Sequence, residues 1–472
     1  MARGRKQRRS RRDGFQRLPV KDVHGLTVST SSAEAGAAME GALSSFLKFR
    51  LDAREHLSRS LAADPEFGLA HCLKGYFAML LYKQAGVAPA AQSARTARPL
   101  VAKATARERS HVEALDAWAA GDLDRTLAIW EAILADYPTD TLALRLAHLK
   151  YFWLGRPRDM LASVERVVPQ WDRDLPGWGA ILSCRCFAHE ECGNYVIAEA
   201  AGRAAVELDP ADLWATHAVA HIMEMQDRHD DGIAWLGELE RHWAGGNNLL
   251  HHLWWHRALF HLERREFEEV LDLYDRRFRD LNSPLAQLQP DFHIDIQNAA
   301  SMLFRLERHD VPVGDRWIEL ADKAEKRIGD CRSPFTLPHW LMALAATGRY
   351  EAAQRMLEEM RAFSRGGETI AAVVGDVALP VGEAVLAHRR GQYARAVELM
   401  RPVLADMHRL GGSHAQQDVL NQLFLDAAVK AERADDVRLI LARVADQHGA
   451  AQTQRVGYAD AARRVLSSGN GG

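Results

Sequence analysis

The chain of 472 residues contains few cysteines and few of the patterns that mark a membrane protein or a sheet. The five cysteines are odd in number and show no disulfide spacing, so we expect reduced thiols in a cytoplasmic protein. No unbroken run of 18 apolar residues occurs, which argues against a transmembrane helix. Sustained alternation of Val, Ile and Thr, the pattern that predicts strands, is also nearly absent.

The chain also lacks the motifs of several common enzyme classes. None of the patterns GxxxxGK[ST], GxGxxG, GxSxG or HExxH occurs, so nucleotide-dependent chemistry and serine hydrolysis have no support. A strong excess of basic charge occurs in residues 1–17, which carry eight basic side chains and one acid, whereas the whole chain is −3. The acidic remainder has no basic stripe for a phosphate backbone, which argues against a nucleic-acid partner. The basic tail alone could touch nucleic acid or an acidic protein.

The chain does contain a helical pattern that is interrupted by turn residues at regular intervals. Ala, Leu, Glu and Arg are abundant throughout, and these residues favour helices. Glycine-centred turns at Gly121, Gly155 and Gly193 are separated by 34 and 38 residues, which is the cadence of a helix–turn–helix repeat. The sequence therefore predicts an all-α, tetratricopeptide-like array of helical hairpins, an α-solenoid.

The spacing of these turns is regular in some parts of the chain and irregular in others, and on this basis the sequence predicts four segments. We expect a basic, disordered leader over residues 1–30 and an N-terminal helical region over 31–104. Regular repeats are expected over 105–280, and degenerate helical repeats over 281–468 that could close over the groove of the array.

Two histidine pairs are the most specific feature of the sequence. His217 and His221 are four residues apart, as are His252 and His256, so each pair lies on one face of its helix. The pairs are 35 residues apart, close to one repeat, so equivalent positions of stacked repeats place the four imidazoles together. Glu224 lies on the same face as the first pair, and Trp255 adds an aromatic wall to the second.

This histidine patch admits three interpretations. It could line a concave groove that binds a peptide or a small ligand. It could instead hold a divalent metal ion, with Glu224 as a ligand or base, or act in acid–base catalysis, because imidazole suits both roles. The third interpretation is that the histidines are structural. The acid of the HExxH motif is missing, since Ala218 follows His217, so the sequence does not specify a metal.

Three other groups of residues contain side chains that could bind a metal or a ligand. Cys186, His189 and Cys192 step by three along one helix, but we expect buried structural thiols there. For Glu108 and His111 we expect a solvent-exposed pair or a capping contact. The face formed by His414, Asp418 and Asn421 follows a Gly-Gly break and could look into the groove or a pocket.

Several segments match one known family in order and spacing. They are HAVAHIMEM (217–225), HLWWHRAL (252–259), SMLFRLE (301–307), VGDRW (313–317), DVALP (376–380) and GGSHAQQDVLNQL (411–423). From residue 31 onward the chain resembles the tetratricopeptide repeat protein 38 family. The resemblance implies an all-α repeat fold in a soluble protein and supplies no reaction. The basic leader has no counterpart in that family.

The sequence thus leaves two functions open. One is a cytoplasmic repeat protein that binds a peptide, a protein segment or a small molecule in a His/Trp-lined groove. The other is an enzyme that uses the same histidines with a divalent metal or as acid–base groups. The residues expected at such a site are His217, His221, Glu224, His252, Trp255, His256, His414, Asp418 and Asn421, the four paired histidines being the metal candidates.

Overall fold

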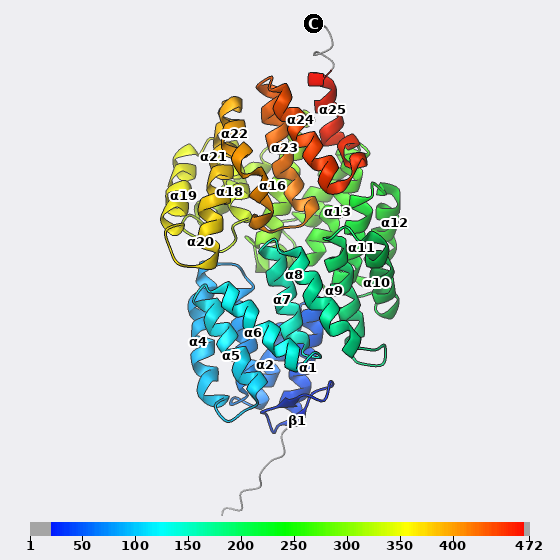
Figure 1. Cartoon of the computed structure of the whole chain (residues 1–472), viewed down its shortest axis with the longest axis vertical. Helices are drawn as coiled ribbons and strands as arrows, with labels where there is room; N and C mark the ends of the chain where they lie inside the picture. The colour runs from blue at the N-terminus through cyan, green and yellow to red at the C-terminus, as the bar shows by residue number, and fades with distance from the viewer. Residues whose placement is uncertain (1–19, 467–472) are drawn as a thin grey trace, which may run out of the picture.

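The computed structural model describes residues 20–466, and helices make up most of that stretch. They follow one another as antiparallel pairs, and each pair packs on the next (Figure 1). This arrangement confirms the predicted all-α, tetratricopeptide-like array of helical hairpins. In Figure 1 the N-terminal helices occupy the lower half and the C-terminal helices the upper half.

The described chain begins with a short antiparallel ribbon packed against the first helix. Residues 20–30 are therefore structured, although they were expected to belong to a disordered leader; the basic residues 1–17 lie outside the described part. Two hairpins follow. The elements are β1 (Val20–Lys21), β2 (Thr27–Val28), α1 (Ala33–Leu47), α2 (Ala53–Ala63), α3 (Gly68–Met79) and α4 (Gln84–Leu100).

The middle of the chain forms five successive hairpins in which the helices contact their sequence neighbours. Short 3-10 or π turns extend some of the second helices. The elements are α5 (Ala106–Ala119), α6 (Leu123–Asp136), α7 (Thr141–Trp153), α8 (Pro157–Val167), η1 (Val168–Gln170), α9 (Trp178–Glu190), α10 (Tyr195–Leu208), α11 (Leu213–Met225), α12 (His229–Leu239), η2 (Glu240–His242), α13 (Leu249–Glu263), α14 (Phe267–Leu273) and η3 (Tyr274–Phe278).

The C-terminal part continues the array with less regular pairs. Its hairpins are interrupted by short helices and by π and 3-10 segments. The elements are α15 (Pro284–Leu288), α16 (His293–Glu307), α17 (Arg316–Glu325), α18 (Thr336–Ala346), α19 (Tyr350–Phe363), α20 (Thr369–Val373), η4 (Val374–Ala378), α21 (Leu379–Arg389), α22 (Tyr393–Met400), η5 (Arg401–Leu410), α23 (His414–Lys430), α24 (Ala434–His448), η6 (Ala450–Gln454) and α25 (Val456–Leu466).

Glycine turns end the first helix of several hairpins, as the spacing predicted. Gly121 and Gly155 have φ values of +84° and +63°, a left-handed conformation that suits glycine. At Gly155 a side chain is also excluded by space, because a Cβ would lie 1.8 Å from the carbonyl oxygen of His408. This turn therefore packs directly against η5, far along the chain.

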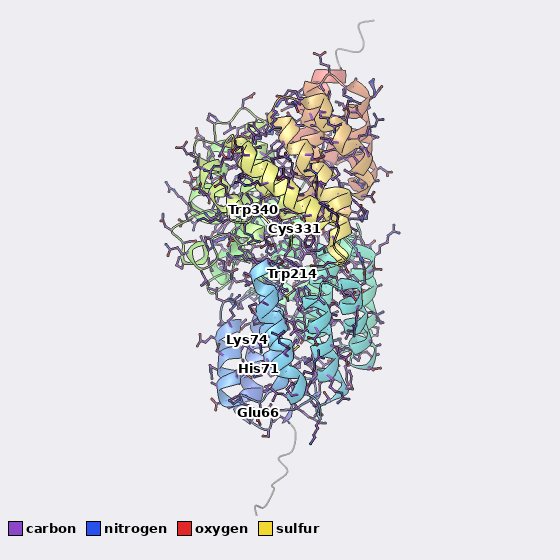
Figure 2. All side chains as sticks on the ribbon, turned by 90° about the vertical axis from the view of Figure 1, so that its left-hand side faces the viewer. Glu66, His71, Lys74, Trp214, Cys331 and Trp340 are labelled. Carbon is purple, nitrogen blue, oxygen red and sulfur yellow. The ribbon has the colours of Figure 1, made fainter. Side chains whose placement is uncertain are left out.

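The first helices of the central hairpins, from α7 to α13, lie inside the molecule. All 13 residues of α11 are buried, and so are 12 of the 15 residues of α13. The cover comes from the C-terminal part, since α23 contacts both α11 and α16. Figure 2 shows the order of these parts from the side: Lys74 marks α3 in the lower half, Trp340 marks α18 in the upper half, and Trp214 of α11 lies between them. The array is thus closed on itself.

One helical stretch, Thr369–Arg389, is long and apolar enough to span a membrane by length and composition alone. Its most apolar 18-residue window has a mean hydropathy of 1.8, and 67% of that window is buried inside the protein. The stretch comprises α20, η4 and α21, and α21 packs against α18 and α19. Its apolar character is accounted for by this place in the core.

Candidate functional site

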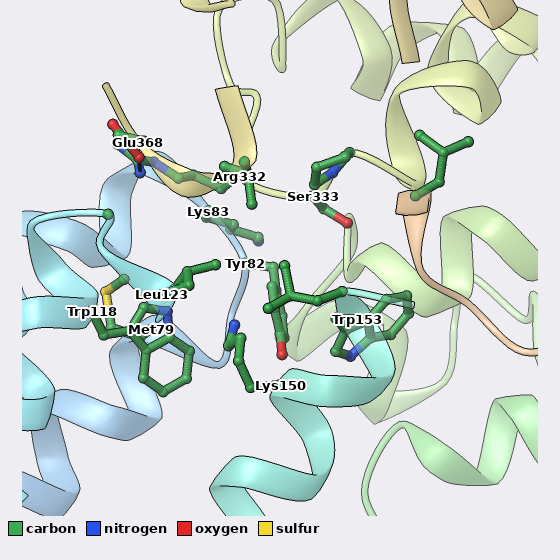
Figure 3. Close-up of a pocket in the computed structure, with 15 residues that line it drawn as sticks. Met79, Tyr82, Lys83, Trp118, Leu123, Lys150, Trp153, Arg332, Ser333 and Glu368 are labelled. Atoms are coloured by element: carbon green, nitrogen blue, oxygen red, sulfur yellow. Dashed lines mark hydrogen bonds and ion pairs between the residues drawn. The ribbon is translucent and has the colours of Figure 1, made fainter. Parts of the chain in front are cut away.

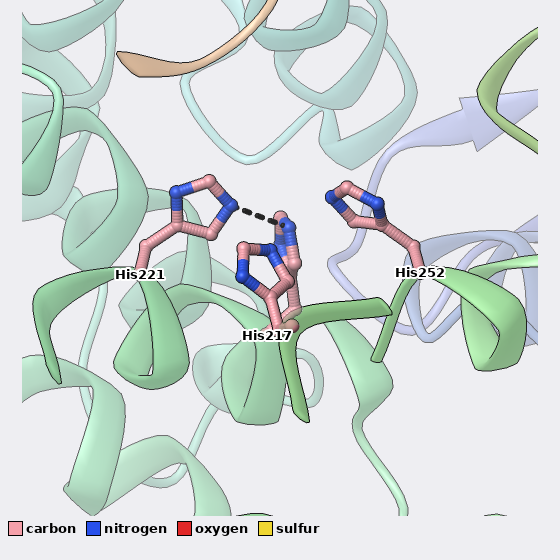
Figure 4. Close-up of side chains that lie close together, drawn as sticks. His217, His221 and His252 are labelled. Atoms are coloured by element: carbon pink, nitrogen blue, oxygen red, sulfur yellow. Dashed lines mark hydrogen bonds between the residues drawn. The ribbon is translucent and has the colours of Figure 1, made fainter. Parts of the chain in front are cut away.

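Four histidines converge between α11 and α13, the first helices of successive hairpins. One ring nitrogen from each of His217, His221, His252 and His256 lies within 4.8 Å of the corresponding atoms of the other three. The Nε2 atoms of His217 and His221 are 2.8 Å apart, the hydrogen bond drawn in Figure 4. None of the four side chains is more than 3% exposed. We call this group the four-histidine centre.

Neighbouring side chains orient the second pair. The Nδ1 atom of His252 is 2.9 Å from Oδ1 of Asn298 on α16; the ring donates this hydrogen bond, because an amide oxygen can only accept. Nε2 of His252 is therefore the lone-pair nitrogen in this neutral ring. The indole of Trp255 stacks on the same imidazole, with ring centroids 5.0 Å apart and planes 11° from parallel.

The environment keeps these histidines neutral. Burial lowers the pKa of His217, His221 and His256 well below 6.5, and the other imidazoles of the centre lower each of them further. Burial lowers the pKa of His252 to about 4, although its bond to Asn298 acts in the opposite direction. Neutral imidazole is the form that binds metal ions, so no deprotonation is needed near pH 7.

The donor set fits a transition-metal ion. Both nitrogens of His256 and the Nδ1 atoms of His217 and His221 have no hydrogen-bond partner in the protein. In tetrahedral coordination by imidazole, with metal–nitrogen bonds of about 2.0–2.1 Å, ligand atoms lie roughly 3.4 Å apart. One nitrogen of each ring lies within 4.8 Å of the others, so the rings would shift by about an ångström to reach that spacing. Four imidazoles suit zinc, copper, nickel or iron.

The expected open groove is not present at these histidines. α11 and α13 do face each other, but α16 and α23 pack over them, so the patch is buried rather than concave surface. Trp255, expected as the wall of the groove, is 0% exposed. A peptide cannot reach these side chains without displacing the C-terminal helices.

Glu224 does not belong to the four-histidine centre, contrary to expectation. Its Oε1 accepts a 2.6 Å hydrogen bond from Arg455, and Arg455 also donates to Glu263 at 3.0 Å. Burial raises the pKa of Glu224 to about 7, and the Arg455 charge opposes that rise. This carboxylate is held in an ion-pair network that ties the C-terminal segment to α11 and α13.

The three polar residues expected on α23 serve different purposes. Asp418 accepts hydrogen bonds from Arg305 and Tyr458 and belongs to the ion-pair network. His414 and Asn421 instead line a cavity of about 630 Å³ between α8, the end of α9 and the start of α23. At its edge His414 forms a second cluster with Glu190 and Glu191, with ligand atoms within 4.8 Å of one another.

The two remaining sequence clusters are structural. Cys186 is free and buried, as expected, whereas Cys192 is half-buried and lines the cavity of about 630 Å³. His189 pairs with Glu165 rather than with the thiols. Glu108 closes a capping box with Thr105 at the start of α5, and Nε2 of His111 lies 3.0 Å from Asp140.

A small cavity of about 40 Å³ adjoins the amine of Lys150 (Figure 3). Nζ lies 4.2 Å from the ring centre of Trp118 and 4.7 Å from that of Tyr82, and burial lowers the pKa of Lys150 to about 7. The space holds little more than one water molecule, so it is too small for a ligand.

Sequence reasoning missed Asn298 and Glu190, which lie beside the centre, and Arg455, which pairs with Glu224. Asn298 orients His252, Oε2 of Glu190 lies 3.9 Å from Nδ1 of His221, and Arg455 neutralises Glu224. Each comes from a segment that is remote from its partner in the sequence. The EE pair at 190–191, at the end of an apolar helix, was the one local signal available.

No known family model matches the chain. Among solved structures, it is similar to yeast Tom70, with a TM-score of 0.34 and 12% identity, covering 92% of this chain and 96% of that one. It is also similar to a structure of Naa15/Naa10 bound to HypK-THB, with a TM-score of 0.24, 13% identity and coverage of 87% and 68%. Both scores are low, and the description of the fold rests on the helices themselves.

Proposed function

We propose that this helical-repeat protein binds a late first-row divalent metal ion, with Zn²⁺ the first to test, at the four-histidine centre. The observation that carries the proposal is the convergence of four buried, neutral imidazoles from two adjacent repeats. Four protein ligands fill a tetrahedral zinc sphere, which is the pattern of structural rather than catalytic zinc. The ion would join successive hairpins and stabilise the array.

Burial alone does not distinguish a metal ligand from a core histidine in this protein. His148 is also buried, and neither of its ring nitrogens has a hydrogen-bond partner in the protein. What sets the four-histidine centre apart is that one nitrogen from each of four imidazoles lies within 4.8 Å of the others. A solitary imidazole cannot hold a zinc ion, whereas four can.

The test is elemental analysis of the full chain purified without a metal-affinity tag, beside a His221→Ala/His256→Ala double variant. We expect about one equivalent of metal in the parent and near none in the double variant. The matched control is His148→Ala, another buried histidine on a first helix, which should retain the metal. A parent that takes up no Zn²⁺, Ni²⁺, Co²⁺ or Cu²⁺ on dialysis would overturn the proposal.

A protein partner, a cytoplasmic location and membership of the tetratricopeptide repeat protein 38 family are kept as further proposals. The hairpin array supports the first, because repeat arrays present extended surfaces to partners. Free cysteines support the second. The ordered motifs between residues 217 and 423 support the third. A peptide groove or acid–base catalysis at the four histidines is not proposed, since these side chains are buried.

A further inference from the structure

A second group of metal-type donors lies next to the four-histidine centre and borders the cavity of about 630 Å³. Glu190 and Glu191 end α9, and His414 begins α23. Glu190 is 0% exposed, and neither of its carboxylate oxygens has a hydrogen-bond partner. Glu191 is also buried, with its Oε1 unpartnered, and its Oε2 is 4.0 Å from Nε2 of His414. Both oxygens of the buried Glu190 are thus available as ligands within the cluster.

No described lysine or arginine forms a salt bridge with either carboxylate. Other buried acids of the described chain pair with arginine, as Asp140 and Glu224 do, or accept hydrogen bonds from neutral groups, as Asp295 does from Asn248. Two carboxylates held close together in a dry site must share a proton or gain a countercharge, because burying an unpaired charge is costly. A divalent cation supplies that charge and also satisfies the free oxygens.

The place of the cluster in the fold gives access to such an ion. Glu191 and His414 line the cavity of about 630 Å³, whereas Glu190 lies behind them, beside His221. His448 also lines the cavity, and its ring centroid is 4.5 Å from that of His414. Three ligands leave coordination positions open, as they do in metal sites that receive water or a substrate.

We propose that Glu190, Glu191 and His414 form a second divalent-metal site on the cavity side of the four-histidine centre. Two carboxylates and one imidazole form a harder donor set than four imidazoles, so this site suits Mn²⁺ or Fe²⁺, and the four-histidine centre suits Zn²⁺. The open positions of the second ion face the cavity and can take an oxygen ligand from a small molecule. The inference goes beyond the proposed function, because it adds a site and can hold if the first site fails.

The test measures Mn²⁺ binding to the full chain after it has been treated with one equivalent of Zn²⁺. The electron paramagnetic resonance signal of free Mn²⁺ reports the unbound ion. We expect one Mn²⁺ per parent chain, and affinity that is at least about tenfold weaker in a Glu190→Gln/Glu191→Gln variant, since lost ligands weaken binding at least as much as lost supporting contacts do. Zinc content should stay unchanged in that variant.

The matched control is Glu165→Gln. This carboxylate lines the same cavity but already accepts hydrogen bonds from Arg185 and His189, so its loss should leave Mn²⁺ affinity unchanged. Thermal unfolding in chelator checks that the glutamine variants fold, and they should be at least as stable as the parent. Parent protein that binds no Mn²⁺, or Glu190→Gln/Glu191→Gln protein that binds it equally well, overturns the second site. Zinc content reports separately on the first.

Discussion

Two buried histidine clusters of this protein are built in opposite ways. Around His111, each charge has a partner: Asp140 accepts hydrogen bonds from Arg107 at 2.8 Å, from His111 at 3.0 Å and from the backbone of Ala143 at 2.8 Å. In the four-histidine centre no described carboxylate lies within hydrogen-bonding distance, and four ring nitrogens have no hydrogen-bond partner in the protein.

The difference separates a structural network from a binding site. A buried polar group left without a partner costs roughly 1–3 kcal/mol, so folding proteins normally satisfy it internally. The His111 network does so completely with residues of the protein. The four-histidine centre gathers several such groups at one point, and a metal ion would satisfy them together. Four measurements test this difference between the two histidine clusters.

The largest effect is expected from Asp140→Ala. The substitution removes the N-cap of α7 and leaves Arg107 buried without its anion, so we expect a loss of about 3–5 kcal/mol in unfolding free energy. Urea denaturation measures it. The control is Asp124→Ala, which removes an exposed salt bridge with Arg156 and should cost less than about 1 kcal/mol. Equal losses in the two variants would contradict the paired-network description.

Metal removal tests the other cluster. At a free Zn²⁺ concentration a hundredfold above Kd, binding to the folded state alone stabilises the protein by about 2.7 kcal/mol. Adding EDTA should therefore lower the Tm of the parent by several degrees and leave that of the His221→Ala/His256→Ala variant unchanged. An identical EDTA shift in both proteins would show that the stabilising ion binds elsewhere.

The two clusters should also respond to acid in different pH ranges. In folded, metal-free protein, burial lowers the pKa of His252 from 6.5 to about 4. As the pH falls, His252 is therefore protonated in the unfolded chain before it is protonated in the folded one. Its contribution to stability is present above pH 6.5 and is lost as the pH falls from 6.5 towards 4. Burial raises the pKa of Asp140, but His111 and Arg107 hold this pKa well below 3.8. The contribution of the Asp140 carboxylate to stability therefore declines only below about pH 4.

Denaturation of metal-free Asp140→Ala and His252→Gln proteins across this range checks the assignment. The loss of stability between pH 6.5 and 4 should become shallower in His252→Gln and should persist in Asp140→Ala. If His252→Gln has the parent's slope, this imidazole does not titrate as described.

The smallest effect is expected from His148→Phe. This imidazole is buried without a hydrogen-bond partner, and it packs against the rings of Phe187 and Trp214 at 5.9 Å. A phenyl ring keeps the aromatic packing and removes the unsatisfied nitrogens, so the change should be neutral or stabilising by up to about 1 kcal/mol. Thermal unfolding measures it. A clear loss of stability would mean that this nitrogen has a partner after all.

Much of the architecture could be predicted because it follows from local rules. Glycine turns, capping residues and helix-forming composition act within a few residues, so the hairpins and their 34-residue cadence were readable from the sequence. The convergence of His217 with His252 could also be expected, because periodic spacing on stacked repeats is itself a local pattern.

The parts that could not be predicted depend on how the array bends. Small rotations at each repeat add up along the chain, and no single residue encodes the sum. Whether α23 packs onto α11 or stays apart decides if the histidines are surface or core. Glu224 is an example. Its ion-pair partner, Arg455, is 231 residues away, so the sequence around either residue does not predict the pair.

The ion-pair network of Arg455 has a consequence for the order of assembly. During synthesis α11 and α13 emerge long before Arg455, which pairs with residues made 192 and 231 positions earlier. N-terminal parts of a chain generally fold first, so the four histidines meet while their cover is still being made. An ion can enter during that interval and is then enclosed, and its later escape requires the C-terminal helices to detach. Exchange with a chelator should then proceed at the rate of that detachment, independent of chelator concentration.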